Sequence, residues 1–191
     1  MASMLTSGFL KRRYLFLILV LFWIPIHSSF GQKTFVTFET TNKSNTICQG
    51  KTLGIIATIE PGISKFQGFK WLGDSLTLRK TSNEIAVVNT QKSGEKKITF
   101  SLTLENGIIL DTSIVIVVLP KPEVQIRYDN NNINIFNKHE VELVDFSWFY
   151  DGSLIHRGFI PTFANPQKGN YKVMVKDKNG CVSTSDPLEI L

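Results

Sequence analysis

Apolar and polar side chains alternate along two separate segments of the chain, residues 98–104 and residues 171–176. Alternation with period two places one face of an extended segment in a core and the other in water, so each segment predicts a half-buried β-strand. An Asn-Gly pair follows each segment, and such a pair adopts the positive φ angles of a tight hairpin. Each strand is therefore expected to turn back into a final strand. These two final strands would span residues 108–119 and 181–191.

The chain carries this arrangement twice. The stretches GFKWLGDSLTLRK and SWFYDGSLIHRG each contain a Trp, a Gly/Asp pair and a short apolar segment with a basic residue at its end. The Asn-Gly pair follows Trp71 after 35 residues and Trp148 after 31. Helical periodicity is absent beyond residue 31, and short strand patterns recur between turn residues. This organisation is typical of antiparallel β-sandwiches, and we predict two of them in tandem in an all-β protein.

The boundary between the two predicted sandwiches falls at Leu119-Pro120-Lys121-Pro122. Two prolines in this stretch remove hydrogen-bond donors from any strand ladder and stiffen an extended chain. We therefore expect one domain at residues 32–119, a second at 120–191, and a short, semi-rigid link between them.

The first 31 residues are predicted to be an export signal. Lys11, Arg12 and Arg13 precede an apolar run of 13 residues, and small residues follow it, so cleavage is expected before Gln32. A spanning helix needs roughly 20 apolar residues, which disfavours the alternative of a permanent membrane anchor. After cleavage no membrane span is expected. The mature chain carries 21 − 3 = 18 basic and 16 acidic residues, a net charge of +2. This small excess does not predict a nucleic-acid partner.

Four short motifs carry a resemblance to a known family. They are Cys48-Gln49-Gly50, Gly169-Asn170-Tyr171, Asn179-Gly180-Cys181 and Ser183-Thr184-Ser185. Together they resemble the immunoglobulin-like (PKD-like) repeats of secreted and cell-surface proteins of Bacteroidetes-type bacteria. The first copy departs from the pattern with Ile108 in place of a Cys, and the second has no opening Cys near residues 127–128. Neither copy can therefore form a disulfide within itself.

The resemblance implies structural roles for three aromatic residues. Trp71 and Trp148 match the core tryptophan of an immunoglobulin-like sandwich, and sugar stacking is the alternative role for them. Tyr171, two residues after Gly169, matches a tyrosine-corner position, in which the phenol bonds a nearby backbone group.

The resemblance also suggests a partner for each of the two cysteines. Cys48 would lie at the end of the first sandwich where the chain leaves it, and Cys181 at the end of the second where the chain arrives. Because the link is short and an exported protein meets oxidising conditions, a Cys48–Cys181 disulfide across the joint is our hypothesis. Its role would be to lock the angle between the domains. Two free thiols and pairing with another chain are the alternatives.

No constellation for catalysis or metal binding is evident in the mature sequence. His139 and His156 are its only histidines, and no Cys or carboxylate stands at metal-ligand spacing from them. Residues 129–132 and 177–179 could offer oxygen ligands to calcium, yet neither has the spacing of a known calcium loop. We expect no cofactor, no metal and no enzymatic activity.

The expected function is structural and interactive. We predict an exported protein for adhesion, spacing or assembly at the bacterial cell envelope, with other envelope proteins or surface glycans as partners. The predicted location is secreted or cell-surface, and periplasmic residence stays open. The alternative is a carbohydrate-binding module, for which Phe149 and Phe163 are the candidate exposed aromatics.

Overall fold

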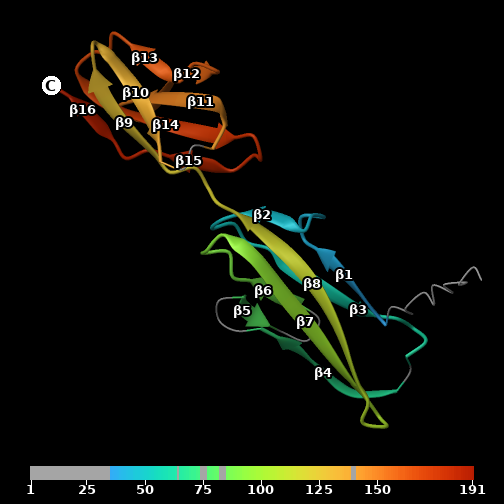
Figure 1. The fold of residues 1–191 in the computed structure, drawn as a ribbon. Helices are drawn as coiled ribbons and strands as arrows, with labels where there is room; N and C mark the ends of the chain where they lie inside the picture. Colours follow the sequence, from blue (N-terminus) through green and yellow to red (C-terminus); the bar gives the residue numbers. More distant parts are fainter. Residues whose placement is uncertain (1–34, 64, 74–76, 82–84, 139–140) are drawn as a thin grey trace, which may run out of the picture. The chain divides into compact units, whose positions relative to one another are not determined.

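The computed structural model describes residues 35–63, 65–73, 77–81, 85–138 and 141–191. The chain divides into two units, Met1–Lys33 and Thr34–Leu191, and all described residues belong to the second. The predicted signal peptide and His139 therefore lie outside the described residues. Within the described ranges every regular element is a β-strand (Figure 1), in agreement with the predicted all-β class.

The strands β1–β8 form an N-terminal sandwich of two four-stranded sheets. In spatial order the first sheet consists of β1 (Val36–Thr40), β3 (Gly54–Ile59), β6 (Ile85–Val88) and β5 (Leu78–Thr81). The second consists of β2 (Thr46–Cys48), β8 (Ile109–Leu119), β7 (Gly94–Leu104) and β4 (Phe66–Leu72). All pairings are antiparallel except that of β2 with β8, which is parallel.

Alternating side chains of both sheets meet in the interior of this sandwich. Ile98, Phe100 and Leu102 of β7 are almost fully buried, as their period-two spacing predicts. They pack in two adjoining clusters with buried side chains of the opposite sheet. Leu53, which directly precedes β3, is one of these buried side chains. The others lie in the strands of that sheet and are Val36, Ile55, Ala57, Leu78, Ala86 and Val88.

The strands β9–β16 form a C-terminal sandwich. Its smaller sheet consists of β13 (Thr162–Ala164), β10 (Asn132–Asn137) and β9 (Val124–Asp129). Its larger sheet consists of β12 (Ser153–Gly158), β11 (Leu143–Tyr150), β14 (Gly169–Asp177) and β15 (Val182–Thr184), with β16 (Leu188–Ile190) also paired to β14. Residues 120–123 connect β8 to β9 and belong to neither strand.

The core of the C-terminal sandwich forms around β11 and β14. Trp148 pairs with Val173, and both side chains are completely buried. Val124, Ile126 and Ile133 of the smaller sheet close this core from the other side. The two sandwiches, each with its own core, constitute a tandem immunoglobulin-like fold.

The final strands differ from their prediction. In both hairpins only the Gly adopts a positive φ, 81° at Gly107 and 83° at Gly180, and the loop is three residues long. The second final strand is also divided into β15 and β16. Pro187 lies in the gap, and because proline has no backbone N–H it cannot continue the ladder with β14.

Candidate functional site

A disulfide bond joins Cys48 to Cys181 and so links the two sandwiches covalently, as the sequence hypothesis proposes. The Cα atoms lie 5.4 Å apart, and the cysteines are 133 residues apart in sequence. Cys48 is the last residue of β2, whereas Cys181 follows the turn after β14 and is completely buried. The linker at residues 120–123, between β8 and β9, is the other covalent connection between the two sandwiches.

The pairing of β2 with β8 determines the position of Cys48. Cys48 is in register with Leu119, the last residue of β8, and the amide of Gln49 donates to the Leu119 carbonyl at 2.8 Å. The amide of Gly50 donates to the carbonyl of Thr90 at 2.9 Å. These bonds hold Cys48 at the end of the N-terminal sandwich where the chain passes into the linker.

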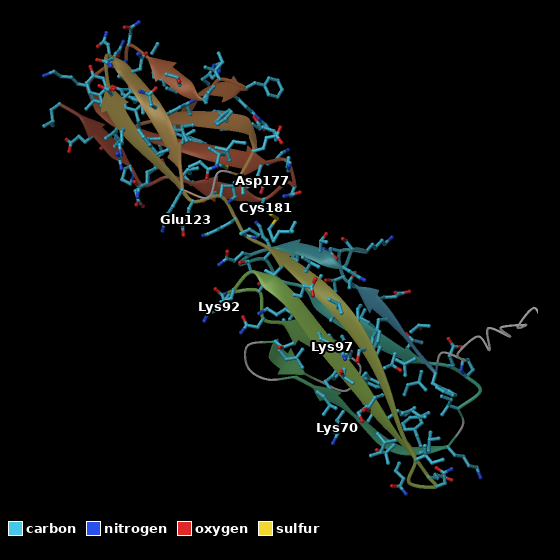
Figure 2. The ribbon with its side chains drawn as sticks, in the orientation of Figure 1. Lys70, Lys92, Lys97, Glu123, Asp177 and Cys181 are labelled. Atoms are coloured by element: carbon cyan, nitrogen blue, oxygen red, sulfur yellow. A yellow bond between two sulfur atoms is a disulfide. The ribbon has the colours of Figure 1, made fainter. Side chains whose placement is uncertain are left out.

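The turn that presents Cys181 is organised by Asp177, whose side chain is almost fully buried. Its Oδ1 atom accepts hydrogen bonds from the amides of Asn179 at 2.9 Å and Cys181 at 2.8 Å. The Asp177 amide donates to the Cys181 carbonyl, and the Gly180 amide donates to the Asp177 carbonyl, both at 3.0 Å. Figure 2 shows Asp177 and Cys181 close together at this turn. One carboxylate oxygen thus fixes the backbone on both sides of Gly180.

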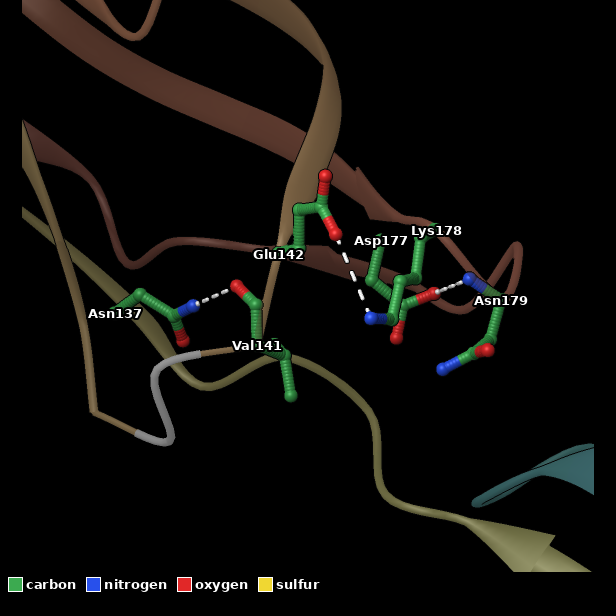
Figure 3. Close-up of polar contacts among 6 residues, drawn as sticks. All are labelled: Asn137, Val141, Glu142, Asp177, Lys178 and Asn179. Atoms are coloured by element: carbon green, nitrogen blue, oxygen red, sulfur yellow. Dashed lines mark hydrogen bonds and ion pairs between the residues drawn. The ribbon is translucent and has the colours of Figure 1, made fainter.

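Contacts to the segment before β11 brace the same turn (Figure 3). The amide of Lys178 donates to the Glu142 carbonyl at 3.1 Å, and the Lys178 Nζ lies 3.4 Å from Glu142 Oε2. Asn137 Nδ2 donates to the Val141 carbonyl at 2.7 Å. Because the Lys178–Glu142 ion pair is exposed, it contributes little free energy, and the backbone bond is the more important contact.

The role of Asp177 was not anticipated from the sequence, which suggested only that residues 177–179 could offer oxygens to calcium. The Oδ2 atom of Asp177 is buried and has no hydrogen-bond partner in the described part of the chain. Across the same ranges no three His, Cys, Asp or Glu side chains gather at a potential metal site. An Asp four residues before a Cys in an Asn-Gly-Cys turn was the available sequence signal.

The asparagines of the turn at residues 129–132, the other calcium candidate, stabilise the backbone of that turn. Asn130, Asn131 and Asn165 adopt positive φ angles of 49°, 62° and 50°. The Asn131 Nδ2 donates to Asn165 Oδ1 at 2.8 Å, and the Tyr128 hydroxyl donates to Asn131 Oδ1 at 3.0 Å. These amides are thus engaged in stabilising a strained turn.

Trp71 and Trp148 differ in their surroundings. Trp148 is completely buried, and its Nε1 donates to the Ile160 carbonyl at 3.3 Å. Trp71 is only partly buried and packs against Phe38 and Phe100, with ring centroids 5.9 Å and 5.0 Å away. Its Nε1 is buried without a hydrogen-bond partner in the ranges that the structure describes. The structure therefore places both indoles against cores, Trp148 more deeply.

Tyr171 is buried on β14, the strand that pairs with β11. Its phenol oxygen accepts a hydrogen bond from the Gln167 backbone amide at 2.8 Å. This is the backbone contact expected of a tyrosine corner. Burial raises the pKa of the Tyr171 phenol above its ordinary value of 10.0, and the hydrogen bond from Gln167 offsets part of that rise.

The remaining candidate residues, Phe149, Phe163 and His156, are all partly buried but have different surroundings. The prediction that Phe163 is an exposed aromatic is wrong. Its ring centroid lies 5.8 Å from that of Trp148 and 5.5 Å from that of Tyr171, so the ring packs against the core. Phe149 is partly buried and lines a surface hollow. His156 pairs with Trp148 across the sheet, and its Nε2 has no hydrogen-bond partner among the described residues. No helix in those ranges is long and apolar enough to cross a membrane.

No protein-family model matches the chain, and no curated protein sequence matches it. Among solved structures, the chain is similar to the fibronectin(III)-like modules of Clostridium thermocellum CbhA, at 14% identity over 81% of this chain and 93% of that chain, with a TM-score of 0.36. It is also similar to murine CEACAM1b, at 11% identity over 82% of this chain and 98% of that one, with a TM-score of 0.37.

A third similar structure is the C-terminal fragment of intimin in complex with the intimin-binding domain of its translocated receptor. The identity is 10%, the coverage is 82% of this chain and 64% of that chain, and the TM-score is 0.43. Identities and TM-scores this low do not determine a shared function. The class of the protein follows from its own strand pairings and cores, which are those of tandem immunoglobulin-like β-sandwiches.

Proposed function

We propose that this protein is an exported, non-enzymatic spacer and interaction protein of the bacterial cell envelope, with envelope proteins or surface glycans as its partners. The observation that carries the proposal is the Cys48–Cys181 disulfide between the two sandwiches. Structural disulfides persist in oxidising compartments outside the cytosol, which supports export. A bond between two folded bodies restricts their relative rotation, as a spacer requires.

The proposal includes the processing and the domain boundaries of the chain. A signal peptide at residues 1–31 is removed, leaving domains at 32–119 and 120–191. The prolines at 120 and 122 stiffen the short link, and the disulfide supplies the second tether. The mature protein is secreted or displayed at the cell surface, and residence in the periplasm is the competing location.

Three measurements on protein from the native host test this proposal. Intact mass should correspond to a chain that begins at Gln32, with or without cyclisation of that residue. Non-reducing peptide mapping should recover the Cys48 and Cys181 peptides joined in a monomer. Protease treatment of intact cells should degrade a surface-displayed protein and spare a periplasmic one. Retention of residues 1–31 in the cytosol, with two free thiols, would contradict the proposal.

A further inference from the structure

A hollow of about 500 Å³ lies on the larger sheet of the C-terminal sandwich, on the face turned away from the core. This volume falls in the usual range for small-molecule sites, roughly 300–1,000 Å³. The hollow is lined by Phe149, Asp151, Gly152, Asn170, Lys172 and Pro187.

The floor of the hollow follows from strand alternation. Trp148 of β11 and Tyr171 of β14 point into the core, so their neighbours Phe149 and Lys172 face the opposite side of the sheet. Phe149 and Lys172 are direct partners across the two strands. A phenylalanine and a lysine side chain therefore start from neighbouring positions on the accessible face of the sheet.

The division of the final strand leaves one side of this floor open. The strand β15 pairs with Met174–Lys176, and β16 pairs with Gly169–Tyr171, so the gap between them lies beside Lys172. Pro187 occupies the gap and lines the hollow. An uninterrupted final strand would have continued the ladder past Lys172.

The opposite wall is the turn between β11 and β12, and it is held in place. Asp151 and Gly152 have φ angles of 46° and 81°. The Asp151 amide donates to the Asn170 carbonyl at 2.9 Å, and the Asn170 amide donates to Asp151 Oδ1 at 3.0 Å. This reciprocal pair fixes the turn against β14.

The polar side chains of the hollow are accessible to a ligand. Asp151, Asn170 and Lys172 are all exposed, and no ion pair joins Lys172 to Asp151 in the described part of the chain. The set therefore offers one acceptor, one amide that both donates and accepts, and one donor around a partly buried ring.

This combination matches a sugar ring better than other ligand classes. A pyranose has a face of C–H groups that packs on the electron-rich face of an aromatic ring, and hydroxyls that both donate and accept around its edge. A single carboxylate is too few oxygens for a divalent cation, and one lysine is too little charge for a polyphosphate.

We propose that the hollow binds one pyranose unit of a polysaccharide, with its C–H face on Phe149 and its hydroxyls on Asp151, Asn170 and Lys172. This inference rests on the proposed function, of which it specifies one partner class, and it does not depend on the disulfide. Phe149 is the only aromatic residue among those that line the hollow, so the affinity of one unit is expected to be about millimolar.

Titration of the exported, disulfide-intact protein by two-dimensional NMR tests the proposal. The probes are the hexasaccharides of cellulose, laminarin, xylan, mannan and chitin, each added to millimolar concentration. At least one should shift the amide signals of Gly152, Asn170 and Lys172 selectively. Phe149→Ala should weaken that binding about tenfold or more, whereas Phe149→Tyr should retain it.

Phe159→Ala is the matched control, because Phe159 is 83% exposed and does not line the hollow. It should leave binding unchanged, and Lys172→Met should weaken binding without altering the fold. The proposal is overturned if no hexasaccharide shifts these amides, or if Phe149→Ala and Phe159→Ala bind equally well. Neither result affects the export and disulfide measurements, so the spacer function is judged separately.

Discussion

The backbone amide of Cys181 donates a 2.8 Å hydrogen bond to Oδ1 of Asp177, four residues earlier in the chain. The same oxygen accepts from Asn179, so the carboxylate determines the course of the turn that carries the buried sulfur. Asp177 therefore positions one half of the disulfide without touching it chemically.

Replacing Asp177 with Ala should destabilise the C-terminal sandwich by about 1–3 kcal/mol, because the buried amide of Cys181 and the partly buried amide of Asn179 lose their acceptor. Asp177→Asn keeps an acceptor oxygen and should cost less. Thermal unfolding of the oxidised proteins measures both effects. Asp186→Ala, an exposed carboxylate in the same sandwich, is the control. Equal melting temperatures for Asp177→Ala and Asp186→Ala would contradict the assigned role.

Removing the disulfide with the double substitution Cys48→Ala and Cys181→Ala should leave both sandwiches folded, because neither core depends on the bond. The expected cost to stability is about 2–4 kcal/mol. Freed of its second tether, the linker at residues 120–123 should be cleaved faster by an added protease. Mass spectrometry of limited digests locates the cut. Equal cleavage rates for the oxidised and substituted proteins would show that the bond does not restrain the linker.

Trp148→Ala should cost about 3–5 kcal/mol, because it empties a fully buried site and leaves the Ile160 carbonyl without its donor. Trp71→Ala should cost less, since Trp71 is only partly buried. Denaturant unfolding monitored by near-ultraviolet circular dichroism compares them. Trp148→Phe, which retains most of the volume, should fall between Trp148→Ala and the parent. A larger loss of unfolding free energy for Trp71→Ala than for Trp148→Ala would contradict our conclusion that Trp148 is the more important core residue.

Tyr171 should make stability depend on pH in the alkaline range. Its folded-state pKa is raised above 10.0, the value for the unfolded chain, so the folded protein retains the phenol proton longer. The contribution of this proton to the free energy of unfolding is complete below about pH 10. It is lost as the pH rises through the folded-state pKa. Melting temperatures between pH 8 and 12 should fall more steeply for the parent than for Tyr171→Phe. Equal dependence of melting temperature on pH for the two proteins would contradict a raised pKa for the Tyr171 phenol.

Local patterns predicted much of the fold but little of the site. The alternation at 98–104 and at 171–176 identifies β7 and most of β14, because side-chain period is a property of the strand itself. The cysteine pairing could be hypothesised because the chain has only two cysteines.

Features that depend on contacts between distant segments were not predicted. The packing of Phe163 against the core depends on Trp148 and Tyr171, which lie on other strands. The carboxylate of Asp177 acts on a turn whose conformation arises only when β14 and β15 pair. The division of the last strand at Pro187, and with it the hollow beside Lys172, likewise requires knowledge of the register.

The disulfide also changes how the protein would carry mechanical load. A pull applied at Phe35 and Leu191 would pass along β1 and β2 to Cys48, cross the sulfur bridge, and leave through β15 and β16. The 133-residue span between the cysteines would bear no tension, and about 450 Å of extended chain at roughly 3.4 Å per residue would be withheld. Single-molecule stretching should show this length released only after reduction, so that the oxidised protein can extend only through residues 35–48 and 181–191.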